Sequence, residues 1–244
     1  MARDRSIART KVRQPSRSHR LLIRSATLLA AMSFACGMNA GGCGTTPSVP
    51  GVSSGGSTIL DSVPRPVILD SDHVLGQASA SLIVVEYESY QSTACGRFAR
   101  SEFPTIKQNY IDTGKIRWVF RHFPLASESR ARPAAIAAEC AGDQGKFFEY
   151  RDLIYSNPDS SGNVVLTDAQ LKTYADTLGL DRTTFDACIA GDSKNSRIDQ
   201  DVNSGTALGV TDAPTFIVDN QLVAGFTTAA DLSKTLDRHL AGTQ

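Results

Sequence analysis

The 244-residue sequence lacks several signatures that would assign it to common classes of enzyme or binding protein. It has four histidines, and no pair of them has the spacing of metal ligands. It also lacks the glycine-rich loop that cradles phosphates and the G-x-S-x-G turn that presents a catalytic serine. We therefore expect no metal, no other cofactor and no serine nucleophile of that kind.

The sequence has no excess of either charge, because 25 basic residues balance 25 acidic ones. The balance is uneven along the chain. Residues 1–24 hold eight basic residues and one acid, which leaves 17 basic and 24 acidic residues in the rest. This mildly acidic remainder does not support nucleic-acid binding.

No apolar run is long enough to span a bilayer comfortably. The run Ser25–Ala40 follows the basic residues and ends in small side chains, so residues 1–42 are typical of a secretory signal peptide. A basic amphipathic helix that stays in the mature protein is the alternative. Such a signal would place the protein outside the cytoplasm, in the cell envelope or secreted.

Two processing routes fit this signal peptide. Residues 40–43, AGGC, resemble the cleavage motif of bacterial lipoproteins, in which Cys43 would carry the lipid. Ordinary cleavage after Ala35 or Ala40 would instead release a soluble protein. We favour the lipid anchor, because a cysteine is rarely left unpaired at an exported terminus.

Residues 43–66 consist mainly of glycine, serine, threonine and proline. Such a segment cannot bury enough apolar surface to order itself, so we expect a flexible tether. The folded domain is expected to begin at Val67 and to cover residues 67–244.

The most informative stretch is Leu82–Phe98, LIVVEYESYQSTACGRF. Its β-branched start predicts a buried strand, and the polar turn after it predicts a helix that begins near Ser92. Cys95 follows Ser92 by three residues, so both side chains share one face of the first turn. The unpaired amides and the dipole of a helix start favour an anion or a thiolate at this place.

The rest of the pattern predicts an α/β domain with a large helical part. A helix interrupted by Pro104 should lead to a strand at 115–123, which makes a β-α-β unit with parallel strands. Residues 127–207 read as helices and should form an inserted subdomain. Segments 215–218 and 221–224 predict a hairpin that turns at residues 219–220, and a last helix should span 229–240.

Four segments, in the same order, resemble the DsbA group of thioredoxin-like thiol-disulfide oxidoreductases: EYESYQSTACGRF, RHFPL, AAECAGDQGKFFEY and GVTDAPTF. The resemblance covers about residues 67–244 and implies a thioredoxin fold with a helical insertion at about 127–207. Members of that group carry C-x-x-C at the start of the first helix. Here Ser92 occupies the position of the attacking cysteine, and Cys95 that of the resolving one.

A serine cannot replace the attacking thiolate. A helix start can lower the pKa of a cysteine from about 8.5 to roughly 3.5–7.5. An alcohol begins near the pKa of water, about 16, and a helix end shifts a pKa by only ~1.5 units. We therefore expect weak or no dithiol exchange from Ser92.

The resemblance also implies roles for neighbouring residues. Glu86 matches a buried acid that accepts the proton of the resolving thiol. Pro214 matches a cis-proline that faces the motif and leaves the backbone of Ala213 free to pair with an extended peptide. Thr93 and Ala94 complete the expected substrate-binding residues.

The cysteines leave two alternatives open. Cys95 is either a small buried hydrophobe or a single reactive thiol. In an oxidising compartment, Cys140 and Cys188 are either bonded to each other or two buried thiols. Relatives in the DsbA group that carry a bridge here favour the disulfide.

Three functions fit these observations. We favour a DsbA-like protein with impaired exchange that still binds protein or peptide thiols outside the cytoplasm. A thiol-substrate enzyme, similar to kappa-type glutathione transferases, would instead use Ser92 to stabilise a substrate thiolate. A non-enzymatic, membrane-tethered chaperone or assembly module would use the groove beside Pro214.

Overall fold

The computed structural model describes residues 58–242 of the chain, with side chains from Ser62 onward. The expected signal peptide 1–42, the expected lipidation of Cys43 and most of the expected tether 43–66 lie outside the described residues. In the described part, no helix is both long enough and apolar enough to cross a membrane.

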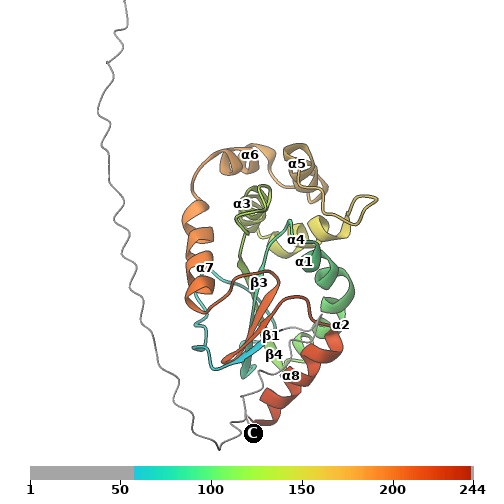
Figure 1. Cartoon of the computed structure of the whole chain (residues 1–244). Coiled ribbons are helices and arrows are strands. Elements are labelled where there is room, and N and C mark those ends of the chain that lie inside the picture. Colours follow the sequence, from blue (N-terminus) through green and yellow to red (C-terminus); the bar gives the residue numbers. More distant parts are fainter. Residues whose placement is uncertain (1–57, 243–244) are drawn as a thin grey trace, which may run out of the picture. The chain divides into compact units, whose positions relative to one another are not determined.

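The domain is built around a six-stranded sheet in the order β1-β6-β5-β3-β4-β2 (Figure 1). β3 and β4 run parallel, as the β-α-β pattern predicts, and every other neighbouring pair is antiparallel. The strands are β1 (Thr58–Asp61), β2 (His73–Leu75), β3 (Leu82–Glu88), β4 (Ile116–His122), β5 (Thr215–Val218) and β6 (Gln221–Ala224).

The predicted start of the folded domain at Val67 was wrong, because β1 lies within the segment expected to be a tether. Thr58 pairs with Ala224 and Asp61 with Gln221 across an antiparallel ladder. Val63 continues the contact by donating its N–H to the carbonyl of Asn220 at 2.8 Å. An edge strand of this kind is held by its backbone, so the short run TILD needed no long apolar pattern to join the sheet.

The helical run between β3 and β4 is divided rather than simply bent. It comprises α1 (Thr93–Arg97), the π-helical η1 (Phe98–Glu102), α2 (Phe103–Ile106) and the π-helical η2 (Lys107–Ile111). Pro104 lies in the first turn of α2 and has no N–H to donate to η1, the helical turn that precedes it. The interruption predicted from Pro104 thus takes the form of wider turns on both sides of it.

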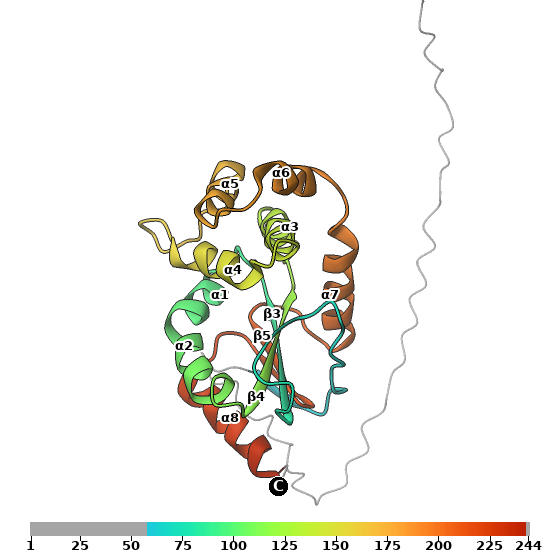
Figure 2. The same cartoon turned by 180° about the vertical axis from the view of Figure 1, so that it is seen from behind.

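Residues 131–207 form the predicted helical insertion, and one more helix closes the chain. The insertion consists of α3 (Ala131–Gly142), α4 (Phe147–Ser156), α5 (Asp168–Thr177), α6 (Arg182–Ala190) and α7 (Asn195–Ala207); α8 spans Ala229–Gly242. Figures 1 and 2 show α3 to α6 gathered at one end of the sheet, α7 along one of its faces, and α2 with α8 along the other.

Alternating side chains of β3 enter two separate cores. Val84 packs with the helices on the side of α2, whereas Val85 and Tyr87 pack on the side of α7. Glu86 and Glu88 share the face of Val84 and are 0% and 1% exposed. The sequence therefore places two carboxylates inside a core, which requires partners from the covering helices.

Cys140 of α3 and Cys188 of α6 form a disulfide that joins positions 48 residues apart. We expect the double variant Cys140→Ala/Cys188→Ala to lose about 4 kcal/mol of unfolding free energy, since the unfolded chain regains the entropy of that closed loop. Urea unfolding of the variant and the native protein measures this difference. An equal midpoint for both proteins would contradict the prediction.

Candidate functional site

Ser92 begins the first helix in the way that the sequence predicts. It is the N-cap of α1, and its hydroxyl oxygen accepts the backbone N–H of Cys95 at 3.3 Å. A serine is among the best residues for this position, because its oxygen satisfies an amide that has no helical partner. Ser92 and Cys95 therefore lie together at the end of β3, at the start of a helix.

The hydroxyl of Ser92 also connects this helix to the chain before β5. It donates a hydrogen bond to the carbonyl oxygen of Ala213, with 3.0 Å between the two oxygens. The contact is buried and joins residues that are 121 positions apart. The peptide bond that follows, Ala213-Pro214, is cis. The structure thus brings Ser92, Cys95, Ala213 and Pro214 to one place.

The backbone of Ala213 is not free, which corrects the sequence-based expectation. Its carbonyl accepts from Ser92, and its N–H donates to the Asp212 carboxylate at 2.8 Å. The reason is local, because the side chain of an Asp can turn back onto the neighbouring amide. Thr93 is exposed and Ala94 half-buried, so both border the contact.

Cys95 lies behind Ser92 and is 0% exposed. Burial raises the pKa of its thiol well above the ordinary value, and the nearby Glu88 acts in the same direction. The N–H of Ser89 lies 3.5 Å from the sulfur and opposes the shift. Cys95 is the one free cysteine among the described residues, and it is held in the neutral form.

Glu86 belongs to a buried ionic group that sequence reasoning found only in part. The guanidinium of Arg151, from α4, contacts Glu88 at 2.8 Å and Glu86 at 3.4 Å. Trp118 donates its indole N–H to Glu86 at 3.0 Å. Burial raises the pKa of Glu86 to about 8 although Arg151 opposes it, so this carboxyl carries a proton at neutral pH.

Arg151 and Glu88 were missed because their pattern carries no local signal. Arg151 follows Tyr150 in a helix whose polar and apolar residues alternate irregularly, and an arginine there is usually a surface residue. A buried acid without a cation is costly, so two glutamates in one apolar strand were the available signal that a cation must come from elsewhere. The Tyr155 hydroxyl also donates to Glu88, at 3.3 Å.

Two histidines join the sheet to the insertion through one carboxylate. His73 of β2 and His122 of β4 each place Nε2 at 2.9 Å from the same oxygen of Glu139 in α3. Although burial opposes it, hydrogen bonds from both rings lower the pKa of Glu139 well below its ordinary value. Within residues 58–242, no group of His, Cys, Asp and Glu side chains has an arrangement that could hold a metal.

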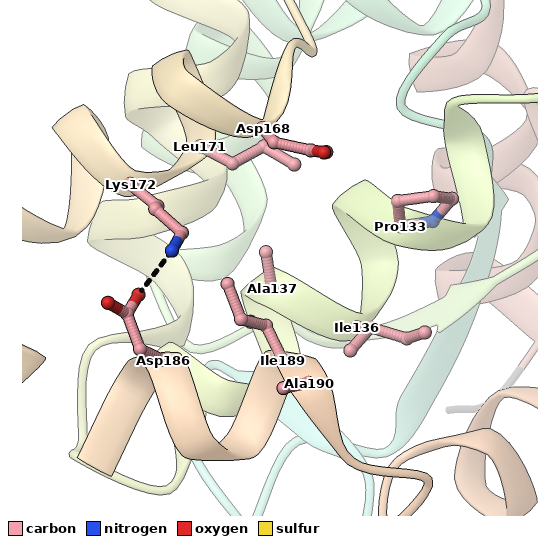
Figure 3. Close-up of a pocket in the computed structure, with 9 residues that line it drawn as sticks. All are labelled: Pro133, Ile136, Ala137, Asp168, Leu171, Lys172, Asp186, Ile189 and Ala190. Carbon is pink, nitrogen blue, oxygen red and sulfur yellow. Dashed lines mark ion pairs between the residues drawn. The ribbon is translucent and has the colours of Figure 1, made fainter. Parts of the chain in front are cut away.

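The helical insertion contains a cavity of about 400 Å³ between α3, α5 and α6 (Figure 3). Lys172 and Asp186 form an ion pair at its edge, at 3.1 Å. None of the predicted site residues lines it. A smaller hollow of about 260 Å³ lies beside Gln91, the residue before Ser92, and is bordered by Arg130 and the chain at 164–167.

The fold and the site together define a class of protein, a thioredoxin-fold domain with an S-x-x-C helix start facing a cis-proline. A family model described as Thioredoxin matches residues 69–238. The crystal structure of BdbD from Bacillus subtilis is similar with a TM-score of 0.67 and 21% identity, over 75% of this chain and all of that one. The structure of α-DsbA1 from Wolbachia pipientis is similar with a TM-score of 0.64 and 27% identity, over 72% and 94%. The chain therefore belongs to the thioredoxin family, in its DsbA-like group of thiol-disulfide oxidoreductases.

A curated relative is similar over only part of its length. A protein of Salinispora tropica named Na(+)/H(+) antiporter NhaA 3 is 36% identical over 157 residues, which are 64% of this chain and 23% of that protein. The chain spans about a quarter of the length of such relatives.

Proposed function

We propose that this protein acts outside the cytoplasm as a DsbA-like protein that has lost dithiol exchange and binds extended peptides beside Cys95 and Pro214. The observation that carries the proposal is the position of the Ser92 hydroxyl. It caps α1 and holds Ala213, at the place where the DsbA group presents its attacking sulfur. The signal-like residues 1–42 support the location, as does the disulfide Cys140–Cys188, because disulfides persist in oxidising compartments.

The proposed loss of dithiol exchange follows from the cysteines that are available to form a catalytic disulfide. To oxidise a dithiol, the protein must itself hold a disulfide that accepts two electrons and two protons. In the described part, Cys140 and Cys188 are bonded to each other, and Cys95 has no sulfur partner. Among these described residues, a mixed disulfide formed by Cys95 would find no resolving thiol, and the burial and raised pKa of Cys95 disfavour even that first step.

Peptide binding needs no sulfur. An added strand pairs through backbone N–H and C=O groups, and Ala213 offers one of each beside the end of β3. The carbonyl oxygen has a second lone pair besides the one used by Ser92. The N–H of Ala213 donates to the carboxylate of Asp212, which is an exposed residue. A peptide carbonyl can replace this carboxylate as the acceptor at little cost in free energy, because water then solvates the carboxylate.

The test is the binding of a fluorescently labelled, extended peptide, followed by anisotropy. The native protein and Cys95→Ala should bind it equally, because the sulfur is buried and makes no contact with the peptide. A matched peptide with N-methylated backbone amides should bind several-fold more weakly, since it cannot donate to Ala213. Loss of binding in Cys95→Ala, or equal binding of both peptides, would contradict strand addition.

One observation disfavours the thiol-substrate enzyme considered from the sequence. Stabilising a substrate thiolate would require the Ser92 hydroxyl to donate its proton to the ligand. In the structure, the hydroxyl of Ser92 already donates its hydrogen bond to the carbonyl oxygen of Ala213.

A further inference from the structure

The cavity in the helical insertion has mostly apolar walls. They come from Pro133, Ile136 and Ala137 of α3, Leu171 of α5, and Ile189 and Ala190 of α6. Ile136 and Ile189 are only half-buried, so their side chains keep apolar surface that the fold leaves uncovered. An apolar cavity of about 150 Å³ can hold one benzene ring. The cavity here, of about 400 Å³, therefore has room for a compact molecule of about two rings.

A covalent bond fixes the spacing of two of these walls. The disulfide Cys140–Cys188 joins α3 to α6. Cys140 follows Ile136 by one helical turn, and Cys188 directly precedes Ile189, so the bond lies close to both lining side chains. The cavity is thus built into the fold before any ligand arrives. Preformed cavities with apolar walls and a few polar groups are typical of sites for small molecules.

The ion pair between Lys172 and Asp186 supplies the polar part of the lining. Nζ of Lys172 lies 3.1 Å from Oδ1 of Asp186, and Figure 3 shows the pair on one side of the cavity with Pro133 on the other. Asp186 has a second cation, because Nη2 of Arg182 lies 3.4 Å from its other oxygen. Asp186 therefore keeps a cationic partner if Lys172 turns to another anion.

A cationic ligand would find no comparable partner in this cavity. Asp168 also lines it, but its carboxylate already contacts Arg130. The carboxylate of Asp186 already contacts two cations. Of the three charged residues in the lining, Lys172 is the one that can change partner without leaving an acid of the cavity unpaired. The charges therefore favour a ligand that carries an anion.

We propose that this cavity binds a small organic acid with a compact apolar body, such as an aromatic carboxylate or sulfonate. The apolar body fills the space between α3, α5 and α6. The anionic group lies at the edge and accepts a hydrogen bond from Nζ of Lys172, while Arg182 stays with Asp186. None of the residues proposed to bind a peptide lines the cavity, so this site does not depend on the proposed function.

The test uses two fluorescent probes that share their rings and differ in charge. The probe 1-anilinonaphthalene-8-sulfonate is an anion, and N-phenyl-1-naphthylamine lacks the sulfonate. Each is titrated into the full-length protein. Lys172→Met should weaken binding of the sulfonate about threefold to fivefold, the effect expected of a partly exposed ion pair, and should leave binding of the neutral probe unchanged. Lys172→Arg keeps the charge and should restore binding of the sulfonate.

Two further variants locate the binding. Ala190→Trp places a large side chain in the lining and should weaken the binding of both probes about tenfold or more, because it fills their space. Lys146→Met is the matched control and should change neither affinity, because Lys146 is an exposed lysine that pairs with Glu149 outside the cavity. Urea unfolding shows that each variant is folded, and Lys172→Met, which alters a partly exposed side chain, tests the inference even if Ala190→Trp is not.

Three outcomes would overturn the inference. The first is that the native protein binds neither probe. The second is that Lys172→Met changes the affinity for both probes equally, which would mean that Lys172 does not recognise the anion. The third is that a folded Ala190→Trp binds both probes as tightly as the native protein, which would place them elsewhere on the molecule.

Discussion

Ser92→Cys should convert the protein into a dithiol oxidase. A thiol at the N-cap of α1 gains the stabilisation of the helix start, which can lower its pKa from about 8.5 to roughly 3.5–7.5. It would stand one turn before Cys95, so the two sulfurs could form the disulfide that exchange requires. We expect the oxidised variant to oxidise a model dithiol peptide at least about 100-fold faster than the native protein, whose rate should match the uncatalysed background.

The controls distinguish the effect of the added thiol from the effect of losing the serine hydroxyl. Ser92→Ala also removes the contact with Ala213 but adds no thiol, and it should stay inactive. Mass spectrometry after alkylation shows whether the variant Ser92→Cys holds a disulfide between positions 92 and 95. Exchange by the native protein at the rate of the variant would refute the proposed loss of activity. An inactive variant in which that disulfide has formed would contradict the claim that the serine at position 92 accounts for the loss.

Arg151→Met should destabilise the domain by about 3–5 kcal/mol, the cost of leaving buried carboxylate charge without its partner. Methionine keeps much of the aliphatic stem and removes the guanidinium that contacts Glu86 and Glu88. The guanidinium also lies over the ring of Phe120 at 4.2 Å, and that attraction would be lost as well. The measurement is the free energy of unfolding from urea titrations at neutral pH. A loss below about 1 kcal/mol, as for an exposed pair, would contradict this account.

Glu86→Gln is the matched control, because an amide resembles the protonated acid. The raised pKa of Glu86, about 8 against 4.5 for the unfolded chain, means that the folded protein holds this proton more tightly. The stability that the folded domain gains by holding this proton is therefore complete below about pH 4.5, and it is lost as the pH rises toward about 8. The variant should cost little at neutral pH, and it should gain stability relative to the native protein as the pH approaches 8.

Much of the fold could be predicted because its signals are local and periodic. The hairpin of β5 and β6 lies at the predicted residues, and β4 lies within the predicted 115–123. The insertion likewise was predicted, over residues 127–207, and its helices lie at 131–207. β1 was missed because four residues between glycine- and serine-rich neighbours give too short a pattern, while the strand is held by the backbone of β6.

For the candidate site, the sequence analysis named residues that the structure places near one another, but it did not predict the hydrogen bonds between them. The resemblance to the DsbA group named Ser92, Cys95, Ala213 and Pro214, and the structure brings them together. The hydrogen bond from Ser92 to Ala213 joins segments 121 residues apart, so no local pattern records it. The occupied N–H of Ala213 depends on the rotamer of Asp212, which a sequence does not specify.

Arg151 has a consequence for how the two parts of the domain depend on each other. It comes from the helical insertion, and the two acids that it contacts, Glu86 and Glu88, belong to β3 in the sheet. Excising the insertion would leave the two acids of β3 without this cation, so we expect that a version of this chain without the inserted helices does not fold. We therefore expect the inserted helices and the sheet to melt in a single transition.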